Sequence, residues 1–505
     1  MHVRAAVFST LILFMAFSSA FGRDRDFPLF GLGRDRNSDR DQPDGQSQSP
    51  PEVTDARSKA DAAYDRQDYA KVVELATWLI ENHPTDNVHV AYYLRASGKV
   101  ELGRIARSGK QIRDAIADAR QGIILAGNEF PWVHIPYLYG LTTLAEVENR
   151  RDHADLAIKV VTPVLQLPES KGFTAEDRAN LYYQRGLAYA ARGDYKLAAA
   201  DHAEAIRLNP QHLGSHIKRA EVLAMLGPGK EALAAYDQAV SRFPNMLVVV
   251  NDRGKLKRSM GDLDGAVADF TRCLSIDPNS GVCFVNRGLC LLEQNSSQAA
   301  EGDFSEALKL KLDPGTNALA LRLRSAARLV QGQGADAIKD LNAAIKINPN
   351  DATLFEERGC AEVFQKDYAA AKTDFAKALQ LNPKLTHVLP WQWVALSRAG
   401  MSSEAHALLE SAVAAKTPPA AWTAKLCAFL LDQASEQELF EAASSGANTR
   451  EKSRQGCEAR YFAGQKQLVK DDAAKAAELF RESVAAKEYS LSAYRGACFE
   501  LGEFK

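Results

Sequence analysis

Prolines recur along the middle of the chain at nearly constant spacing, and this recurrence limits the fold more than any other feature of the sequence. They lie 34, 34, 36, 35 and 34 residues apart, at Pro210, Pro244, Pro278, Pro314, Pro349 and Pro383. All except Pro314 follow an amphipathic segment rich in alanine or aromatic residues, such as AAADHAEAIRLNP. Because proline cannot continue a helix, each of these segments is expected to be a helix that ends there.

A small residue occupies the centre of a second apolar segment upstream in each repeat. These residues are Gly186, Ala220, Gly254, Gly288, Ser325 and Gly359. The segment before the proline carries an alanine–aromatic–alanine series, as in Ala232, Tyr236 and Ala239, in Ala266, Phe270 and Cys273, and in Ala371, Phe375 and Ala378. A turn containing Gly, Asp or Asn joins the two segments, so each repeat is expected to be a helix–turn–helix.

These residues, at this spacing, resemble the tetratricopeptide repeat. The resemblance covers six regular repeats over residues 177–385. It implies an all-α fold, a right-handed superhelical α-solenoid whose first helices line a concave groove that binds extended peptides or helices. A single hairpin cannot bury its apolar face alone, so neighbouring hairpins stack and share a continuous core.

Looser copies of the same pattern flank the regular block. Residues 55–176 predict divergent hairpins, residues 386–419 one further hairpin, and residues 420–505 a helical C-terminal cap over the last repeat. The cap resembles the closing module of a group of bacterial envelope tetratricopeptide proteins, through Trp422, Phe429, Leu430, Leu431, Glu436, Leu439, Cys457, Glu458, Ala459, Tyr461, Phe462, Gly464, Gln465, Phe480 and Val484.

The N-terminus predicts export from the cytoplasm. A short basic start precedes 17 uncharged residues and small residues at Ser18, Ala20 and Gly22, the order of a secretory signal. We therefore expect residues 1–22 to be removed and the mature protein to be secreted or periplasmic, with no membrane span. An uncleaved anchor is the alternative, although 17 residues are short for about 30 Å of hydrocarbon. Residues 23–54, nearly free of aliphatic side chains, predict a disordered tether.

Charge and motif content argue against several classes of function. The chain has 62 basic and 64 acidic residues, a balance unlike that of a dedicated nucleic-acid binder. It contains no nucleophile, phosphate-loop or zinc-protease motif, so an enzyme is not expected and no cofactor is implied. His212 and His216 share a helix face, but no third ligand completes a metal site. Seven cysteines lie in apolar stretches, and a Cys457–Cys498 bridge stays open.

An arginine precedes the small residue of every regular repeat, and an aspartate follows it 16 positions later in five of the six. Such regular spacing predicts a structural ion pair between the two helices, because an arginine fork can hold a carboxylate through two hydrogen bonds. The predicted pairs are Arg185 with Asp201, Arg253 with Asp269, Arg287 with Asp303, Arg324 with Asp340, and Arg358 with Asp374. Arg219 faces Ala235 instead.

Seven residues are candidates for the partner-binding groove by their position in the repeat: Asn180, Tyr183, Asn251, Lys255, Arg258, Arg322 and Glu356. This mixed set predicts recognition of a polar peptide assisted by charge. The function that follows is a non-enzymatic scaffold for protein or peptide partners. Two alternatives stay open: a groove that binds a small ligand or glycan through residues such as Tyr183, and an enzyme with an unrecognised site in the cap around Cys457 and Glu458.

Overall fold

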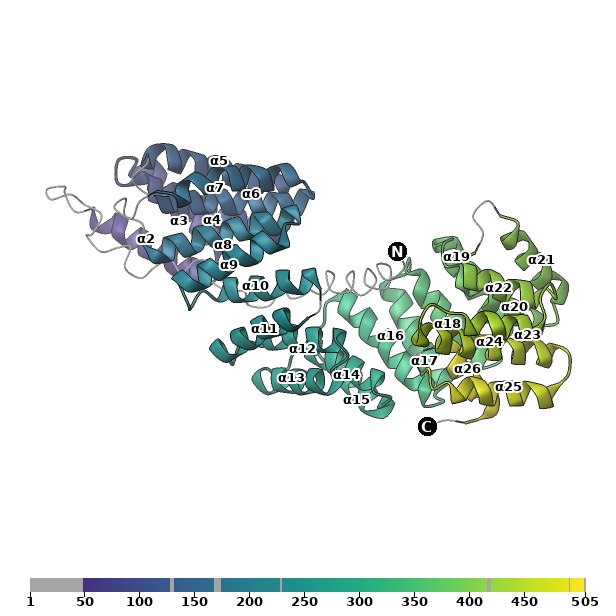
Figure 1. The fold of residues 1–505 in the computed structure, drawn as a ribbon. Helices are drawn as coiled ribbons and strands as arrows, with labels where there is room; N and C mark the ends of the chain where they lie inside the picture. Colours follow the sequence, from purple (N-terminus) through teal and green to yellow (C-terminus); the bar gives the residue numbers. More distant parts are fainter. Residues whose placement is uncertain are drawn as a thin grey trace. The chain divides into compact units, whose positions relative to one another are not determined.

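The computed structural model describes residues 49–127, 131–167, 174–227, 229–415, 419–489 and 491–503, in two compact units that divide after Met260. The described part of the first unit contains the helices labelled α2 to α12 (Figure 1). They are α2 (Pro51–Asp65), α3 (Tyr69–Asn82), α4 (Val88–Ile105), α5 (Gly109–Ala126), η2 (Pro131–Val133), α6 (His134–Glu148), α7 (Arg151–Leu165), α8 (Ala175–Arg192), α9 (Tyr195–Leu208), α10 (Leu213–Leu226), α11 (Lys230–Arg242) and α12 (Leu247–Ser259).

The second unit begins at Gly261 and contains the helices labelled α13 to α26. They are α13 (Leu263–Ile276), α14 (Gly281–Glu293), α15 (Ser297–Lys309), α16 (Pro314–Val330), α17 (Gly334–Ile347), α18 (Ala352–Phe364), α19 (Tyr368–Leu381), η4 (Thr386–Val388), α20 (Leu389–Arg398), α21 (Ser402–Val413), α22 (Ala421–Leu430), α23 (Glu436–Ser444), α24 (Thr449–Val469), α25 (Ala473–Ala485) and α26 (Ser492–Leu501).

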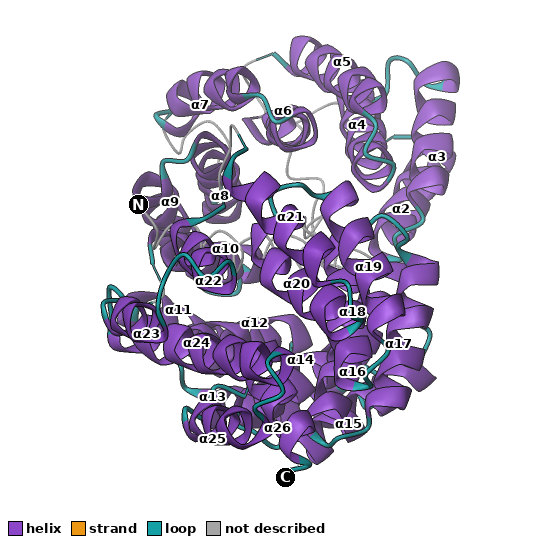
Figure 2. Cartoon of the chain, turned by 90° about the vertical axis from the view of Figure 1, so that its right-hand side faces the viewer, coloured by secondary structure: helices purple, strands orange, loops and turns teal. Residues whose placement is uncertain are grey.

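The described residues form helices and no strand (Figure 2). Within each unit most helices pack against the helices that precede and follow them in the sequence. This nearest-neighbour packing is that of an all-α helical repeat solenoid, in which each hairpin depends on the next one for its core. The predicted fold class is therefore confirmed.

The turns between paired helices follow one local scheme. A residue in the left-handed conformation, such as Gly193 with φ 95° or Lys366 with φ 62°, comes directly before the residue that caps the second helix. Asp367 then accepts a hydrogen bond from the backbone N–H of Ala370 at 3.1 Å. Such a cap satisfies an otherwise unpaired donor and stabilises a helix by about 1 kcal/mol. Gly193-Asp194, Gly261-Asp262 and Lys366-Asp367 are examples of this turn in the sequence.

The two helices of a repeat approach most closely where a glycine faces an aromatic ring 16 residues later. A Cβ atom on Gly288 would lie 2.8 Å from Cε1 of Phe304, and one on Gly359 would lie 2.7 Å from Cε1 of Phe375. Both rings are fully buried. The glycine is thus required by the space between the helices, because any side chain would displace the ring.

The C-terminal cap contains the same crossing, which the sequence analysis did not recognise. Gly464 of α24 faces the buried ring of Phe480 of α25, again 16 residues later, with 2.5 Å to a would-be Cβ atom. Helix α26 packs against α24 and also against the much earlier helix α18. The rings of Phe499 of α26 and Phe364 of α18 stack with centroids 5.1 Å apart.

Within the described residues, no helix is both long enough and apolar enough to span a membrane. The predicted signal, residues 1–22, and residues 23–48 of the predicted tether lie outside the part of the chain that the structure describes.

Two glycines of the hairpin α14–α15 make a matched test of the crossing. Gly288→Ala should lower the free energy of unfolding by about 1–3 kcal/mol, because its methyl group has to displace Phe304. Gly302→Ala should raise it by about 0.5–1 kcal/mol, because nothing lies within 4 Å of the new methyl group and alanine favours the helix. Urea unfolding followed by circular dichroism measures both. Shifts of the same sign in the two variants would contradict the role of the crossing.

Candidate protein-interaction surface

Four of the predicted arginine–aspartate pairs are present, and each joins the first helix of a repeat to the second. Arg185 donates from Nε and Nη2 to the two carboxylate oxygens of Asp201, at 2.7 and 2.8 Å. The other three have the same geometry, with distances of 2.6 to 2.9 Å: Arg287 with Asp303, Arg324 with Asp340, and Arg358 with Asp374. The aspartates are buried, so these two-bond ionic contacts fix the geometry of each hairpin.

Three of these arginines also reach the preceding hairpin through Nη1. The acceptors are Thr271 Oγ1 for Arg287 at 3.3 Å, Ser305 Oγ for Arg324 at 3.2 Å, and Asn342 Oδ1 for Arg358. Each of these forks therefore holds three helices: its own, the second helix of its repeat, and the second helix of the repeat before. A guanidinium can do this because it presents five donors in one plane.

Two arginines of the first unit depart from the predicted pattern. Arg253 donates to Asp237 of the preceding hairpin at 2.8 Å. Its predicted partner, Asp269, belongs to the other unit, so that pair stays a prediction. Arg219, for which the sequence offers no aspartate, donates to Gln238 Oε1 at 3.1 Å.

A fork of the same kind in the divergent hairpin α4–α5 was missed. Arg95 donates to both oxygens of Asp118, at 2.9 and 2.7 Å, and Lys99 adds a third contact at 2.7 Å. The two residues are 23 positions apart rather than 16, because each lies about one helical turn farther from the connection between the two helices than in the regular repeats. The search at fixed spacing could not find this pair.

Three of the predicted groove residues are buried, which corrects their proposed role. Asn180, Tyr183 and Asn251 are 5%, 2% and 0% exposed. Asn180 lies 3.1 Å from the Nε2 atom of His212, and the Tyr183 ring packs against that imidazole with centroids 4.9 Å apart. Their repeat position points toward the groove, but neighbouring side chains cover them. They stabilise the first unit and offer no surface to a partner.

Lys255 and Arg258 of α12 are partly exposed. Lys255 Nζ forms an ion pair with Asp252 at 2.5 Å, and the side chains of both partners are about nine-tenths buried. Arg258 lies in the last turn of the helix, where a positive charge interacts favourably with the helix dipole. Both belong to the first unit, whereas Arg322 and Glu356 belong to the second.

Arg322 and Glu356 lie in a set of polar side chains that the second unit assembles from six helical segments. We call it the polar stripe: Arg322 of α16, Glu356 and Glu357 of α18, His387 of η4, Trp422 of α22, Glu458 of α24 and Arg495 of α26. Six members of the polar stripe contact one another in pairs. The contacts are Arg322 Nε to Glu357 Oε1 at 3.7 Å, His387 Nε2 to Glu356 Oε1 at 2.9 Å, and Trp422 Nε1 to Glu458 Oε2 at 2.7 Å.

The stripe is surrounded by protein and still open to solvent. Burial raises the pKa of the Glu357 and Glu458 carboxyl groups and lowers the pKa of the Arg495 guanidinium. Nevertheless 31% of the Glu357 side chain and 55% of the His387 side chain are exposed. The hydrogen bond from His387 to Glu356 raises the pKa of this imidazole. Charges in such surroundings interact more strongly than on an open surface, because less water screens them.

The comparison with protein families decides the class. Two models of the tetratricopeptide repeat match the chain, one over residues 183–246 and 287–352 and the other over residues 249–280 and 352–385. The chain carries tandem tetratricopeptide repeats. The matched residues fall within the six repeats predicted at 177–385, and repeats of this family are protein-interaction modules.

Solved structures of other proteins are similar to parts of this chain. One from Parabacteroides merdae is 18% identical, with a TM-score of 0.39, covering 50% of this chain and 97% of its own. PilW, a type IV pilus biogenesis factor, is 21% identical, with a TM-score of 0.36 and coverage of 40% and 93%. Yeast Tom70 is 14% identical, with a TM-score of 0.34 and coverage of 78% and 97%. No curated protein matches the chain.

The seven cysteines of the chain are all buried. Burial raises the pKa of the Cys457 thiol to about 12, and its sulfur lies 3.3 Å from Ser483 Oγ. A nucleophilic cysteine needs the opposite shift, toward the thiolate. Glu458, its neighbour in sequence, is held by the Trp422 indole. The geometry around these two residues therefore offers no support for the alternative of an enzyme site in the cap.

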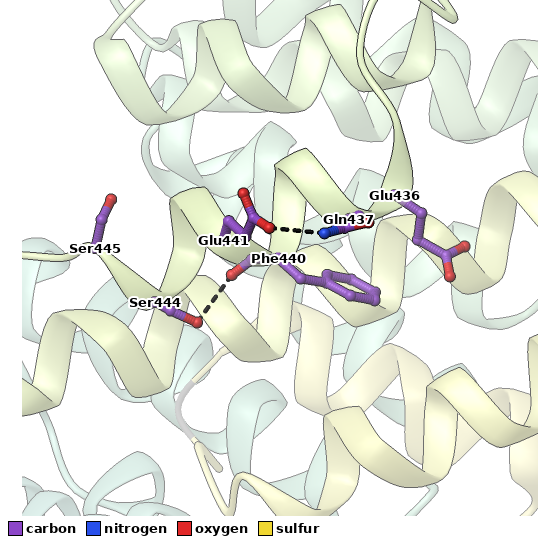
Figure 3. Close-up of a pocket in the computed structure, with 6 residues that line it drawn as sticks. All are labelled: Glu436, Gln437, Phe440, Glu441, Ser444 and Ser445. Atoms are coloured by element: carbon purple, nitrogen blue, oxygen red, sulfur yellow. Dashed lines mark hydrogen bonds between the residues drawn. The ribbon is translucent and has the colours of Figure 1, made fainter.

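The described residues contain no cluster of side chains arranged as a metal site. No group of three or more His, Cys, Asp or Glu side chains there is arranged to hold a metal ion. A surface hollow of about 550 Å³ lies beside α23. Figure 3 shows the side chains that line it: Glu436, Gln437, Phe440, Glu441, Ser444 and Ser445. Since its walls come from one helix and the residue after it, groups from different elements do not converge in it.

Two aspartates on α17 test the forks. Asp340→Asn removes the carboxylate that binds Arg324 and Arg328, and should lower the free energy of unfolding by about 1.5–3 kcal/mol, the range for hydrogen bonds to charged groups. Asp336 pairs only at the surface, with Lys339, so Asp336→Asn should change it by less than about 0.5 kcal/mol. Urea denaturation of both variants measures the difference. Equal effects would show that the fork adds no more than a surface pair.

Proposed function

We propose that this chain is a non-enzymatic scaffold that acts outside the cytoplasm and binds a partner peptide or helix along the polar stripe of its second unit. The observation that carries the proposal is the convergence of the stripe. Its seven members come from six helical segments between Arg322 and Arg495; six of them form three hydrogen-bonded or ion pairs, and the charge of Arg495 interacts with that of Glu357. The forks and the glycine crossings account for packing, whereas these partly exposed charges have no comparable role in the core.

The composition of the stripe favours a polar partner. It combines three carboxylates with two arginines, an imidazole and an indole, so that a bound segment meets acceptors, donors and an aromatic face within one surface. Charge complementarity of this kind contributes mainly to specificity and to the rate of association. The alternative of a small ligand or glycan had Tyr183 as its first candidate, and this side chain is buried.

A charge exchange within the stripe tests the proposal. The variant Arg322→Glu with Glu356→Lys keeps the net charge and reverses the sign at two positions of the stripe. Its control is Asp336→Lys with Lys339→Glu, which exchanges an exposed ion pair on α17, where the two side chains are 51% and 75% exposed. Crosslinking and affinity capture from native cell envelopes should recover the same partner with wild type and control. The stripe variant should lose it while its circular dichroism stays unchanged.

Retention of that partner by the folded stripe variant would exclude the stripe as the binding surface. Loss of the partner from both variants would show a general effect of surface charge, and would likewise count against the stripe.

The proposed location has its own measurement. The basic start and apolar run of residues 1–22 support export, and intact mass analysis of the protein from its native source should find a chain that begins after Ala20 or Gly22. Recovery of the full-length chain from the cytoplasmic fraction would contradict the proposed location.

A further inference from the structure

Two buried histidines and one partly exposed histidine, His212, lie where hairpin α8–α9 meets hairpin α10–α11 in the first unit. His202 and His216 are 0% and 3% exposed. The Tyr183 ring of α8 packs against His202 at 5.5 Å and against His212 at 4.9 Å, between ring centroids. We call this set of three imidazoles and one phenol ring the histidine joint. Histidine is the side chain whose charge ordinarily changes near neutral pH.

His202 takes the place of the aromatic ring at the helix crossing. It faces Gly186, with 2.6 Å between Cε1 and a would-be Cβ atom, as Phe304 faces Gly288 and Phe375 faces Gly359. Within the described structure neither ring nitrogen has a hydrogen-bond partner. A buried polar group without a partner is costly, and a charged one would be far more so. Burial accordingly lowers the pKa of His202 to about 3.

His212 caps α10 in a way that requires a neutral ring. Its Nδ1 atom accepts a hydrogen bond from the backbone N–H of Ser215 at 3.1 Å, while Nε2 lies 3.1 Å from Asn180 Oδ1. A protonated imidazole carries hydrogen on both nitrogens, so Nδ1 could no longer accept and the cap would be lost. Burial lowers the pKa of His212 to about 4.

His216 completes the joint one turn further along α10. Its Nε2 atom lies 3.1 Å from the carbonyl oxygen of Pro210, in the loop that joins the two hairpins, and its ring meets Phe243 edge-on at 5.4 Å. Burial lowers its pKa as well.

The charged groups that face the joint are mostly cationic. Lys218 faces His202, and Arg219 and Arg242 face His216, so that each disfavours a further positive charge. The nearby carboxylates are engaged elsewhere: Glu221 binds Lys218 at 2.7 Å and Asp201 binds Arg185. Glu146 and Glu101 act on Tyr183 rather than on the imidazoles. Nearby negative charges therefore compensate poorly for the positive charge of an imidazole that is protonated in the joint.

We propose that the histidine joint is an acid-sensitive coupling, and that protonation of His202 and His212 below neutral pH releases hairpin α8–α9 from hairpin α10–α11. The buried unpartnered ring and the cap that needs a neutral imidazole are the two observations that carry it. Release would loosen the first unit in a mildly acidic environment while leaving the glycine crossings and arginine forks of the second unit intact.

The sign of the effect follows from linkage. The folded joint resists protonation, whereas the opened chain takes up protons near the ordinary histidine value of about 6.5. Its stability is therefore fully present above that value and is lost as the pH falls toward the lowered folded-state values of His202 and His212. At about pH 5, each of these two imidazoles should shift the balance between closed and open joint by about 30-fold toward the open form.

Amide hydrogen exchange on the full-length protein tests this. We compare protection at about pH 7.5 and about pH 5, corrected for the intrinsic pH dependence of exchange. The wild type should lose protection in α9 and α10 at the lower pH by at least about 30-fold, with α16 to α19 unchanged. Unchanged protection in α9 and α10, or the same loss throughout the chain, would overturn the proposal.

A second experiment repeats the exchange measurement on a variant in which two histidines are replaced by residues that this chain itself carries at equivalent positions. His202→Phe supplies the ring found at the other crossings, and His212→Asn supplies a neutral cap like Asn448, which accepts from the backbone N–H of Glu451 at 2.9 Å. Together they should remove most of the pH-dependent loss, leaving only the share contributed by His216. The control is His153→Asn, which removes an imidazole that pairs with Glu148 outside the joint, and should leave the loss unchanged. An undiminished acid response in the folded double variant would contradict the proposal, and should that variant not fold, the wild-type comparison decides alone.

Discussion

The close approach of two helices at a glycine is the constraint on which the rest of this structure depends. Where Gly288, Gly359 and Gly464 remove a side chain, a buried ring of the second helix fills the space, and the distance between the helices is set. At the first two of these crossings, the preceding arginine reaches across that distance to its aspartate with two hydrogen bonds. The crossing therefore fixes the hairpin, and the fork joins it to the hairpin before.

The same geometry separates packing from recognition. Residues at the crossings and in the forks serve the packing of the array, and the same residue types recur from one hairpin to the next. The polar stripe is different, because each helical segment contributes other side chains and the C-terminal helices add Trp422, Glu458 and Arg495. Function in a repeat protein resides in such non-repeating residues, which the fold positions but does not specify.

Periodic features could be read from the sequence, and features without a period could not. The crossing glycines and four of the arginine pairs recur at fixed spacing, so both could be predicted by comparing the six repeats with one another. The pair Arg95–Asp118 could not be predicted because it lies about one turn farther from the connection between its helices, which changes the spacing. The second half of the stripe could not be predicted because no rule relates α18 to α22, α24 and α26. The position of Tyr183 in the repeat predicted which way its side chain points but not how deeply it is buried. Its burial depends on the imidazoles that pack against it.

The return of α26 to α18 gives a largely local architecture a long-range requirement. Hairpins up to α19 can close from contacts between neighbouring segments as the chain leaves the ribosome. The apolar face of α18 around Phe364, by contrast, also needs Gly496 and Phe499 of α26, which follow more than 130 residues later. A nascent chain without α26 thus leaves part of this aromatic surface open to water, so α18 reaches its final packing only after the helices of the cap have formed.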